Sequence, residues 1–327
     1  MHDFNDDPSQ RLDLKLLLDN SDLSRTFIAK AIKAGLVEVN GKVILKPSFK
    51  IYNSDIINFK ENEAITLIQE KSADNVIPVK MDLNVIFEDE ELLIINKTSG
   101  MPTHPSHGHI TTTLLNGVHE YLHEEASSLK NRKHMVHRLD KDTSGLIIFA
   151  KNEKMLWWLH RQFAERKIEK SYYALGFASK KYNAGTEFKV EGYIERSRRE
   201  KKLYLFSNKY GRWTHTDFEI LKSYSIDSGN VKQYLSLFKC SPKTGRTHQI
   251  RVHLKQINFP IWGDVLYSSD KQKRFVSNYS SSNNIRDRLF LHAYSLKFVS
   301  YSGKNYNIEI PLTEELQNIL NSFNEEK

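Results

Sequence analysis

The sequence predicts an α+β protein with two domains. Its 327 residues exceed the ~250 at which one hydrophobic core usually stops growing, so a small and a large domain are expected. Residues 10–70 fit a small module of two helices and a hairpin, and residues 71–81, which are polar and without a clear period, fit a linker. In residues 82–325, strand-like runs outnumber helical segments and do not alternate with them regularly. This pattern predicts a mixed, largely antiparallel sheet flanked by helices.

The composition is that of a globular protein with a modest positive charge. Forty-eight Lys and Arg against 40 Asp and Glu give a net charge of +8, which favours a polyanionic partner but also fits simple solubility. The single cysteine, Cys240, excludes an intramolecular disulfide and a cysteine zinc site, and its apolar surroundings predict a buried, inert thiol. Residues 1–9 lack the apolar core of a secretory signal, and no segment has the ~18 apolar residues of a membrane span. A soluble cytoplasmic protein is expected.

The first module begins with an apolar segment around Leu12 and Leu16, which Ser24, a suitable N-cap, separates from a second helix. That helix reaches Lys33 and is followed by Gly35. Its apolar positions predict one buried side, and its cations predict a basic face. The buried side would consist of Phe27, Ile28, Ala31 and Ile32, and the basic face of Arg25, Lys30 and Lys33.

A hairpin is expected next. Residues 36–39 and 42–44 are strand-like, and Asn40-Gly41 between them is the dipeptide best suited to a tight hairpin turn. The order of helices, Val-x-Val-Asn-Gly-Lys hairpin and Lys-Pro pair resembles the S-four-like RNA-binding domain over roughly residues 10–60. In that family the basic helix and the hairpin grip structured RNA, which implies RNA contacts for Arg25, Lys30 and Lys33. A capped helix followed by a hairpin also occurs in modules that bind nothing.

The larger domain opens with two short apolar runs, residues 83–87 and 92–95, separated by an acidic turn that is typical of paired strands. Further elements follow the same kind of apolar pattern. Strands are expected over residues 145–150, 172–177, 234–238 and 290–298, and helices over residues 153–166, behind an Asn152 cap, and 313–323.

The densest group of polar side chains lies in residues 137–145, His-Arg-Leu-Asp-Lys-Asp-Thr-Ser-Gly, which read as a loop entering a strand. Asp140 stands between Arg138 and Lys141, and nearby cations favour the ionised carboxylate that an attacking group requires. Charge spacing alone favours a solvated surface loop instead.

The full string His-Arg-Leu-Asp-x-x-Thr-Ser-Gly-Leu resembles the signature of the RluA-type pseudouridine synthases, which isomerise uridine in RNA. The resemblance implies that Asp140 is the catalytic carboxylate, that Arg138 helps hold the rearranged RNA, and that His137 is a neighbouring RNA contact. Attack at C1′, attack at C6 and a glycal route all stay open. The family needs no metal or cofactor, so neither is expected.

Residues 170–174, Lys-Ser-Tyr-Tyr-Ala, resemble the family's Lys-x-Tyr-x-Ala segment. The resemblance implies that Tyr172 packs against the target base beside Asp140 and takes part in proton transfer, with Lys170 as an RNA contact and Tyr173 facing the core. Taken alone, the pattern fits the alternating residues of a half-buried strand.

Residues 241–254 read as a turn entering a helix, with Thr244 and Thr247 as candidate caps. His248 and Arg251 share a helix face by their i,i+3 spacing. His248 and His253 could suggest a metal site, but the spacing lacks the Glu of a zincin, so no metal is predicted.

This segment resembles the family's Thr-Gly-Arg-x-His-Gln-Ile-Arg-Val-His motif. The resemblance implies that Arg251 pairs with Asp140, while Arg246 and His248 support the site or contact RNA. The sequence leaves an exchange of roles between Arg246 and Arg251 open.

Smaller matches extend the resemblance over residues 83–298 in the family's order: residues 96–102, 261–267 and 288–293. Leu291 and His292 are expected to line the site, and Thr98 stands where the family usually has proline, which affects loop stiffness rather than chemistry.

Between residues 196 and 212, cations alternate with aromatic residues, which fits either a strand pair facing RNA or a solvated hairpin.

Together these patterns predict a monomeric RNA pseudouridine synthase that acts on structured RNA, ribosomal RNA before transfer RNA, without a membrane or an obligate protein partner. Two alternatives stay open. One is an RNA chaperone that keeps the fold without the chemistry, against which the presence of Asp140, Tyr172 and Arg251 together argues. The other is an N-glycosidase that uses Asp140 to remove a base.

Overall fold

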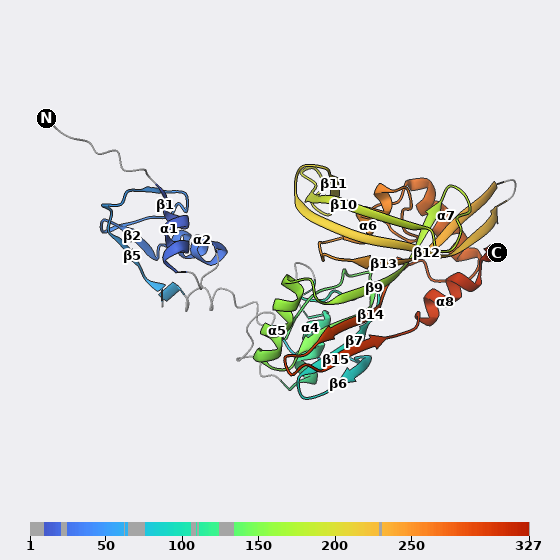
Figure 1. Cartoon of the computed structure of the whole chain (residues 1–327), viewed down its shortest axis with the longest axis horizontal. Helices are drawn as coiled ribbons and strands as arrows, with labels where there is room; N and C mark the ends of the chain where they lie inside the picture. Colours follow the sequence, from blue (N-terminus) through green and yellow to red (C-terminus); the bar gives the residue numbers. More distant parts are fainter. Residues whose placement is uncertain are drawn as a thin grey trace. The chain divides into compact units, whose positions relative to one another are not determined.

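The computed structural model describes residues 10–20, 25–61, 63–64, 76–105, 109, 111–123, 134–228 and 231–326. The chain forms two compact units, which meet in sequence between Asn75 and Val76 (Figure 1). The predicted Ser24 cap, the Phe27 side chain and residues 71–75 of the predicted linker lie outside the described residues. The linker boundaries therefore stay a prediction.

The first unit contains the predicted helices and hairpin. Helices α1 (Leu12–Asp19) and α2 (Arg25–Lys33) precede β2 (Val37–Val39) and β3 (Lys42–Val43), which pair antiparallel. Asn40 and Gly41 adopt φ angles of 52° and 75°, the left-handed conformation that a tight hairpin turn requires. Strand β5 (Ile57–Phe59) pairs with β2, and β1 (Gln10–Arg11) pairs with β4 (Lys50–Ile51). The hairpin prediction is confirmed.

Helix α2 is amphipathic as expected. Ile28, Ala31 and Ile32 are fully buried, whereas Arg25, Lys30 and Lys33 are exposed. These three cations therefore form a basic face on the first unit, in which the guanidinium of Arg25 lies 3.4 Å from the buried carboxylate of Asp13.

The second unit is built on one long sheet. Its described strands run in the order β11, β10, β12, β13, β9, β14, β8, β7, β6, with β15 beside β14 and β16 beside β12 (Figure 1). All pairs are antiparallel except β8 with β14, so the prediction of a mixed, largely antiparallel sheet is confirmed. The bounds are β6 (Val85–Glu88), β7 (Leu92–Lys97), β8 (Ser144–Ala150), β9 (Glu169–Ala178), β10 (Glu187–Arg196), β11 (Tyr204–Ser207), β12 (Arg212–Ser228), β13 (Val231–Pro242), β14 (Leu291–Val299), β15 (Asn305–Glu309) and β16 (Asn324–Glu326).

The parallel pair of β8 and β14 depends on a glycine. Gly145 has a φ of +114°, and a Cβ there would lie 2.2 Å from the backbone oxygen of Ala293. Only glycine tolerates both this conformation and this approach. The start of β8 is thereby held against β14, directly after the loop that carries Asp140.

Helices cover the sheet at places that the sequence partly predicts. Asn152 caps α5 (Glu153–Ala164) by accepting the Met155 N–H at 2.8 Å, and Thr313 caps α8 (Glu314–Asn321). The other described helices of this unit are α4 (Leu114–Tyr121), α6 (Gln249–Gln256) and α7 (Asp270–Ser282). Helix α5 packs against β8, and α6 packs against β11, β12 and β13.

The expected caps of α6 are wrong. Neither Thr244 nor Thr247 caps it, because the helix begins one residue later, after His248, which has a left-handed φ of 57°. The Thr244 hydroxyl instead donates to the Gln249 side chain at 2.7 Å. His248 therefore lies outside the helix, directly before its first residue, Gln249.

The basic and aromatic segment before β12 packs two of its aromatic side chains against α6 and exposes its cations. Tyr204 lies edge-on to His248, and Phe206 packs against His253 of α6. The cations Arg198, Arg199, Lys201, Lys202 and Lys209 are exposed, as is Tyr210. Tyr204 and Phe206 therefore belong to a half-exposed hairpin that packs on α6. No described helix is both long and apolar enough to cross a membrane.

Candidate active site

A pocket of about 290 Å³ lies where the loop before β8, strand β9 and helix α6 meet. It is lined by eight residues to which the sequence assigns catalytic or RNA-binding roles in the second unit: His137, Arg138, Asp140, Lys170, Tyr172, Arg246, His248 and Arg251. Leu291 lines it as expected. His292 does not, because it is fully buried and bonded to Ser144 and to the Pro311 carbonyl.

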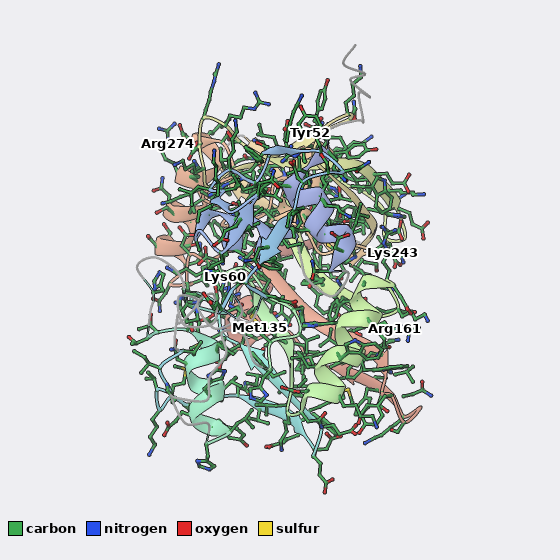
Figure 2. All side chains as sticks on the ribbon, turned by 90° about the vertical axis from the view of Figure 1, so that its left-hand side faces the viewer. Tyr52, Lys60, Met135, Arg161, Lys243 and Arg274 are labelled. Carbon is green, nitrogen blue, oxygen red and sulfur yellow. The ribbon has the colours of Figure 1, made fainter. Side chains whose placement is uncertain are left out.

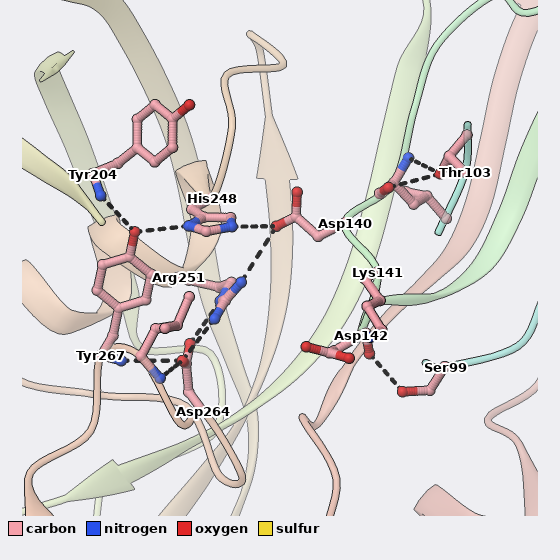
Figure 3. A network of polar contacts seen from close by, with 12 residues as sticks. Ser99, Thr103, Asp140, Lys141, Asp142, Tyr204, His248, Arg251, Asp264 and Tyr267 are labelled. Carbon is pink, nitrogen blue, oxygen red and sulfur yellow. Dashed lines mark hydrogen bonds and ion pairs between the residues drawn. The ribbon is translucent and has the colours of Figure 1, made fainter. Parts of the chain in front are cut away.

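Asp140 projects from its loop toward α6 (Figure 3). Its Oδ2 lies 3.6 Å from Nη1 of Arg251 and 3.8 Å from Nε2 of His248. Both distances exceed the 2.7–2.9 Å of a charge-assisted hydrogen bond. Arg251 therefore supplies a neighbouring positive charge while leaving the carboxylate oxygens free for another partner. The two arginines are thus distinguished, because Arg246 has no ion pair with Asp140.

The position of Arg251 is fixed by a second carboxylate, Asp264. Nε and Nη2 of Arg251 donate to the two oxygens of Asp264 at 2.7 and 2.8 Å, and the backbone N–H groups of Leu266 and Tyr267 donate to the same carboxylate. Both side chains are buried, and this pairing raises the pKa of Arg251 against the opposing effect of burial. No role for Asp264 is predicted from the sequence, although it lies in the matched segment of residues 261–267.

A short chain of hydrogen bonds orients His248 (Figure 3). The Tyr267 hydroxyl accepts the Tyr204 N–H at 2.9 Å and lies 2.8 Å from Nδ1 of His248. Nε2 of His248 faces the Asp140 carboxylate, which only accepts hydrogen bonds. The neutral tautomer with its proton on Nε2 therefore suits both neighbours, with the Tyr267 hydroxyl donating to Nδ1. Burial lowers the pKa of His248, which favours this neutral form.

The loop of Asp140 is clamped from the other side by residues 97–103. Ser99 donates to the Asp142 carbonyl and Thr103 donates to the Leu139 carbonyl, both at 2.7 Å (Figure 3). The Gly100 N–H donates to the Lys141 carbonyl at 2.9 Å. The buried ammonium of Lys97 donates to the carbonyls of Thr98, Met101 and Lys141. These bonds fix the backbone on both sides of Asp140.

Two side chains that line the pocket, Tyr172 and His137, are shielded from water. Burial and the charge of Asp140 raise the pKa of Tyr172 far above its usual value, so its phenol is protonated in the free protein. His137 stacks on Phe163 with ring centroids 5.0 Å apart and accepts the Ile148 N–H, and burial lowers its pKa to about 3. Tyr173 points elsewhere and stacks on Tyr294.

His253 is not part of a site with His248. It is fully buried in α6 and bonded to Thr214 and Thr216 at 2.9 and 3.0 Å. Its ring nitrogens are therefore used inside the core.

Comparison with known proteins identifies this arrangement. Residues 91–256, about half of the chain, match the model of a family described as RNA pseudouridylate synthase, and residues 20–57 match the S4 domain. The chain belongs to the RNA pseudouridylate synthase family. The residues matched in this synthase include the loop of Asp140, strand β9 with Tyr172, and Arg251 of α6.

Curated relatives of the synthase match nearly its whole length. An "Uncharacterized RNA pseudouridine synthase" of Aquifex aeolicus is 36% identical over 88% of this chain and 85% of its own length. A "Ribosomal large subunit pseudouridine synthase C" of Buchnera aphidicola is 32% identical over 96% of this chain and 94% of its own length. The chain is therefore an RNA pseudouridine synthase of the RluA type, an isomerase with an N-terminal S4 domain.

A solved structure supports the fold of the second unit. Human RNA Pseudouridylate Synthase Domain Containing 1 superposes with a TM-score of 0.57, covering 75% of this chain and 89% of its own, at 21% identity.

Proposed function

We propose that this synthase converts specific uridines to pseudouridine in structured large-subunit ribosomal RNA, with Asp140 as the nucleophile. The substrate is inferred from two relatives, whose names read ribosomal large subunit pseudouridine synthase C and D and which match 96% and 95% of this chain. Arg25, Lys30 and Lys33 on the S4 domain would contact RNA away from the reacting nucleotide, and His137, Arg138 and His248 would contact it in the pocket.

One observation carries the assignment of Asp140. Asp140 is the only carboxylate that lines the pocket in the described part of the chain, and Arg251 and His248 hold positive charge and a ring N–H near one of its oxygens. An anion with one free oxygen in a largely buried pocket is suited to attack an electrophilic carbon. The target nucleotide must leave its stack to reach it.

The isomerisation consumes no oxidant, reductant or second substrate. The bond between N1 and C1′ breaks, the base turns, a bond forms between C5 and C1′, C5 loses a proton and N1 gains one. We propose that Tyr172 packs against the base and gives its phenol proton to N1 as the bond between N1 and C1′ breaks. The phenolate then accepts the C5 proton, so that Tyr172 ends protonated as it began. Attack by Asp140 at either C1′ or C6 converts the carboxylate to an ester, and this removes the negative charge that helps to raise the pKa of Tyr172.

The variant Asp140→Asn tests the nucleophile. Pseudouridine formation should fall by at least about 10⁴-fold, because the amide keeps the shape but loses the charge and nucleophilicity. RNA affinity and melting temperature should change little. The matched control is Asp142→Asn, the same chemical change at a residue outside the pocket. Turnover that survives in Asp140→Asn at a rate near that of the control would refute the assignment.

The RNA target is found by chemical mapping of pseudouridine in cells that lack the gene, followed by reconstitution with purified protein. The proposal expects one or a few large-subunit ribosomal uridines to lose modification. Loss at a transfer RNA position would overturn the ribosomal assignment, and an abasic sugar in the product would indicate an N-glycosidase.

A further inference from the structure

A second pocket of about 190 Å³ adjoins the one that holds Asp140. The two pockets share the residues Phe163, Lys170, Thr244, Gly245 and Arg246, and the second adds Arg166 and Lys243 as further cations. Among the residues that the structure describes, no carboxylate lines the second pocket. Four cationic side chains therefore surround a hollow directly beside the proposed uridine site.

Few carboxylates lie near these four cations in the described part of the chain. Arg166, Lys170 and Arg246 have no carboxylate within 4.0 Å there, although the carboxylate of Glu165 is adjacent in sequence. That carboxylate is taken by Arg161 and Lys167, each at 2.7 Å. Lys243 lies 3.4 Å from Asp217, outside the pocket lining.

Burial, and for Arg246 neighbouring positive charge as well, disfavours the protonated form of two of these cations. Burial, together with the charges of Arg212 and Arg166, lowers the pKa of Arg246, and burial lowers the pKa of Lys170 to about 8. Gathering cations without carboxylates costs free energy in the free protein. An anionic ligand would offset that cost.

Arg166 also occupies a strained position. It directly follows Glu165, the C-cap of α5, in a Schellman motif. In this motif the Arg166 N–H donates to the Phe163 carbonyl, and the Lys167 N–H donates to the Gln162 carbonyl. Its φ is 60°, a conformation that favours glycine. Its guanidinium lies 4.7 Å from the centre of the Trp213 ring, and this cation–π contact helps to orient the arginine side chain. A long cation is thus kept where glycine would be the more stable residue.

We propose that Arg166, Lys170, Lys243 and Arg246 form a binding site for a backbone phosphate of the RNA strand, next to the extruded uridine. This inference rests on the proposed function. Arginine suits the site because its planar group can bind two phosphate oxygens at once. The site would anchor the strand on one side of the flipped nucleotide while Asp140 reacts on the other.

The test uses the full-length chain with Asp140→Asn as the background, so that binding is measured without turnover. The probe is a short stem-loop oligonucleotide that carries the mapped uridine. Adding Arg166→Gln should weaken binding about threefold to tenfold and lower the slope of log affinity against log salt by about 0.7, the value for one lost phosphate contact on a single strand.

Two controls separate this result from general effects. Arg274→Gln removes the same charge from exposed α7, on the opposite side of the second unit from Lys243 and Arg161, and should leave affinity nearly unchanged (Figure 2). Arg166→Gly removes the cation while relieving the backbone strain, so its melting temperature should equal or exceed that of the parent while its RNA affinity falls. Equal affinity of Arg166→Gly and the parent would overturn the proposal.

Oligonucleotides in which one phosphate is replaced by a neutral methylphosphonate show which phosphate the proposed site binds. Replacing one phosphate beside the target uridine should weaken binding by the parent but should not weaken it further in Arg166→Gln. Additive losses at every replaced phosphate would show that Arg166 acts only through long-range charge, and would overturn the proposed site. Absence of pseudouridine formation by the unmutated enzyme on any RNA would instead refute the proposed function, so the two failures are distinguishable.

Discussion

Arg251 lies between two carboxylates that it binds differently. It forms two short hydrogen bonds with Asp264 and only a 3.6 Å contact with Asp140. The first carboxylate fixes the guanidinium, and the second is left free to react. An arginine that bound Asp140 as tightly would hold the carboxylate oxygens that attack requires.

We therefore expect Asp264→Asn to lower the single-turnover rate by about 100-fold, because a small displacement of Arg251 misplaces Asp140. The same change should reduce the free energy of unfolding by about 3 kcal/mol, since one partner of a buried ion pair is lost. Single-turnover assays at saturating RNA and urea denaturation measure the two effects.

A control for Asp264→Asn exists in the first unit. Asp13 is equally buried and receives two hydrogen bonds from Arg11, each 2.9 Å long. Asp13→Asn should destabilise the S4 domain but leave the single-turnover rate on saturating RNA unchanged. A rate for Asp264→Asn within a few-fold of that control would contradict the positioning role.

At the scale of elements, the site is formed by backbone segments that hold one another. The segment after β7 makes hydrogen bonds to the backbone of residues 139–142, and Gly145 lets β8 start directly against β14. Lys97, the last residue of β7, contributes three of these bonds to carbonyl oxygens from a buried position. Threonine in place of proline at residue 98 is compatible with this clamp, since its carbonyl is the group used.

We expect Lys97→Met to destabilise the protein by about 3 kcal/mol, because methionine fills the space but leaves three buried carbonyls without their donor. The activity that remains at permissive temperature should also fall, since the Asp140 loop loses its clamp. Thermal unfolding and single-turnover rates test this. The control is Lys154→Met, an exposed lysine that lies over the Tyr301 ring, which should change neither quantity appreciably. Normal stability of Lys97→Met would show that the clamp is dispensable.

At the scale of the whole molecule, the two compact units suggest a division of labour. The second unit contains every described residue of the candidate site, whereas the first carries an exposed basic face. Phosphate contacts by exposed cations add affinity without reading sequence, and they weaken as salt is raised.

Deletion of residues 1–70 should therefore weaken binding to long RNA by about tenfold to 100-fold and broaden the choice of uridine, while activity on a short stem-loop is retained. A full-length variant with Arg25, Lys30 and Lys33 all changed to Gln should reproduce the loss of affinity without removing the domain. Filter binding and pseudouridine mapping measure both effects. Unchanged affinity and selectivity in both variants would show that the S4 domain has no part in substrate recognition.

Much of this architecture is readable from local sequence. The Asn40-Gly41 turn, the Asn152 cap and the alternating apolar strands each depend on residues close together in the chain, so their patterns predict the structure correctly. The predicted α6 caps are wrong because two threonines near the helix start fit the local cap pattern. The residue found there instead, His248, is left-handed, and its side chain contacts Tyr267 and Asp140, which lie far away in sequence.

The family motifs, the order of most elements and the main polar residues of the pocket can be read from the sequence alone, because motif strings and hydrophobic periods are local properties. Three-dimensional packing is needed to see that Arg251 rather than Arg246 lies beside Asp140 and that Asp264 fixes Arg251. The same holds for the hollow around which Arg166 and Lys243 join Lys170 and Arg246. Those relations join segments that are far apart in the chain. Their energies depend on distance and burial, which exist only once the sheet and helices are packed.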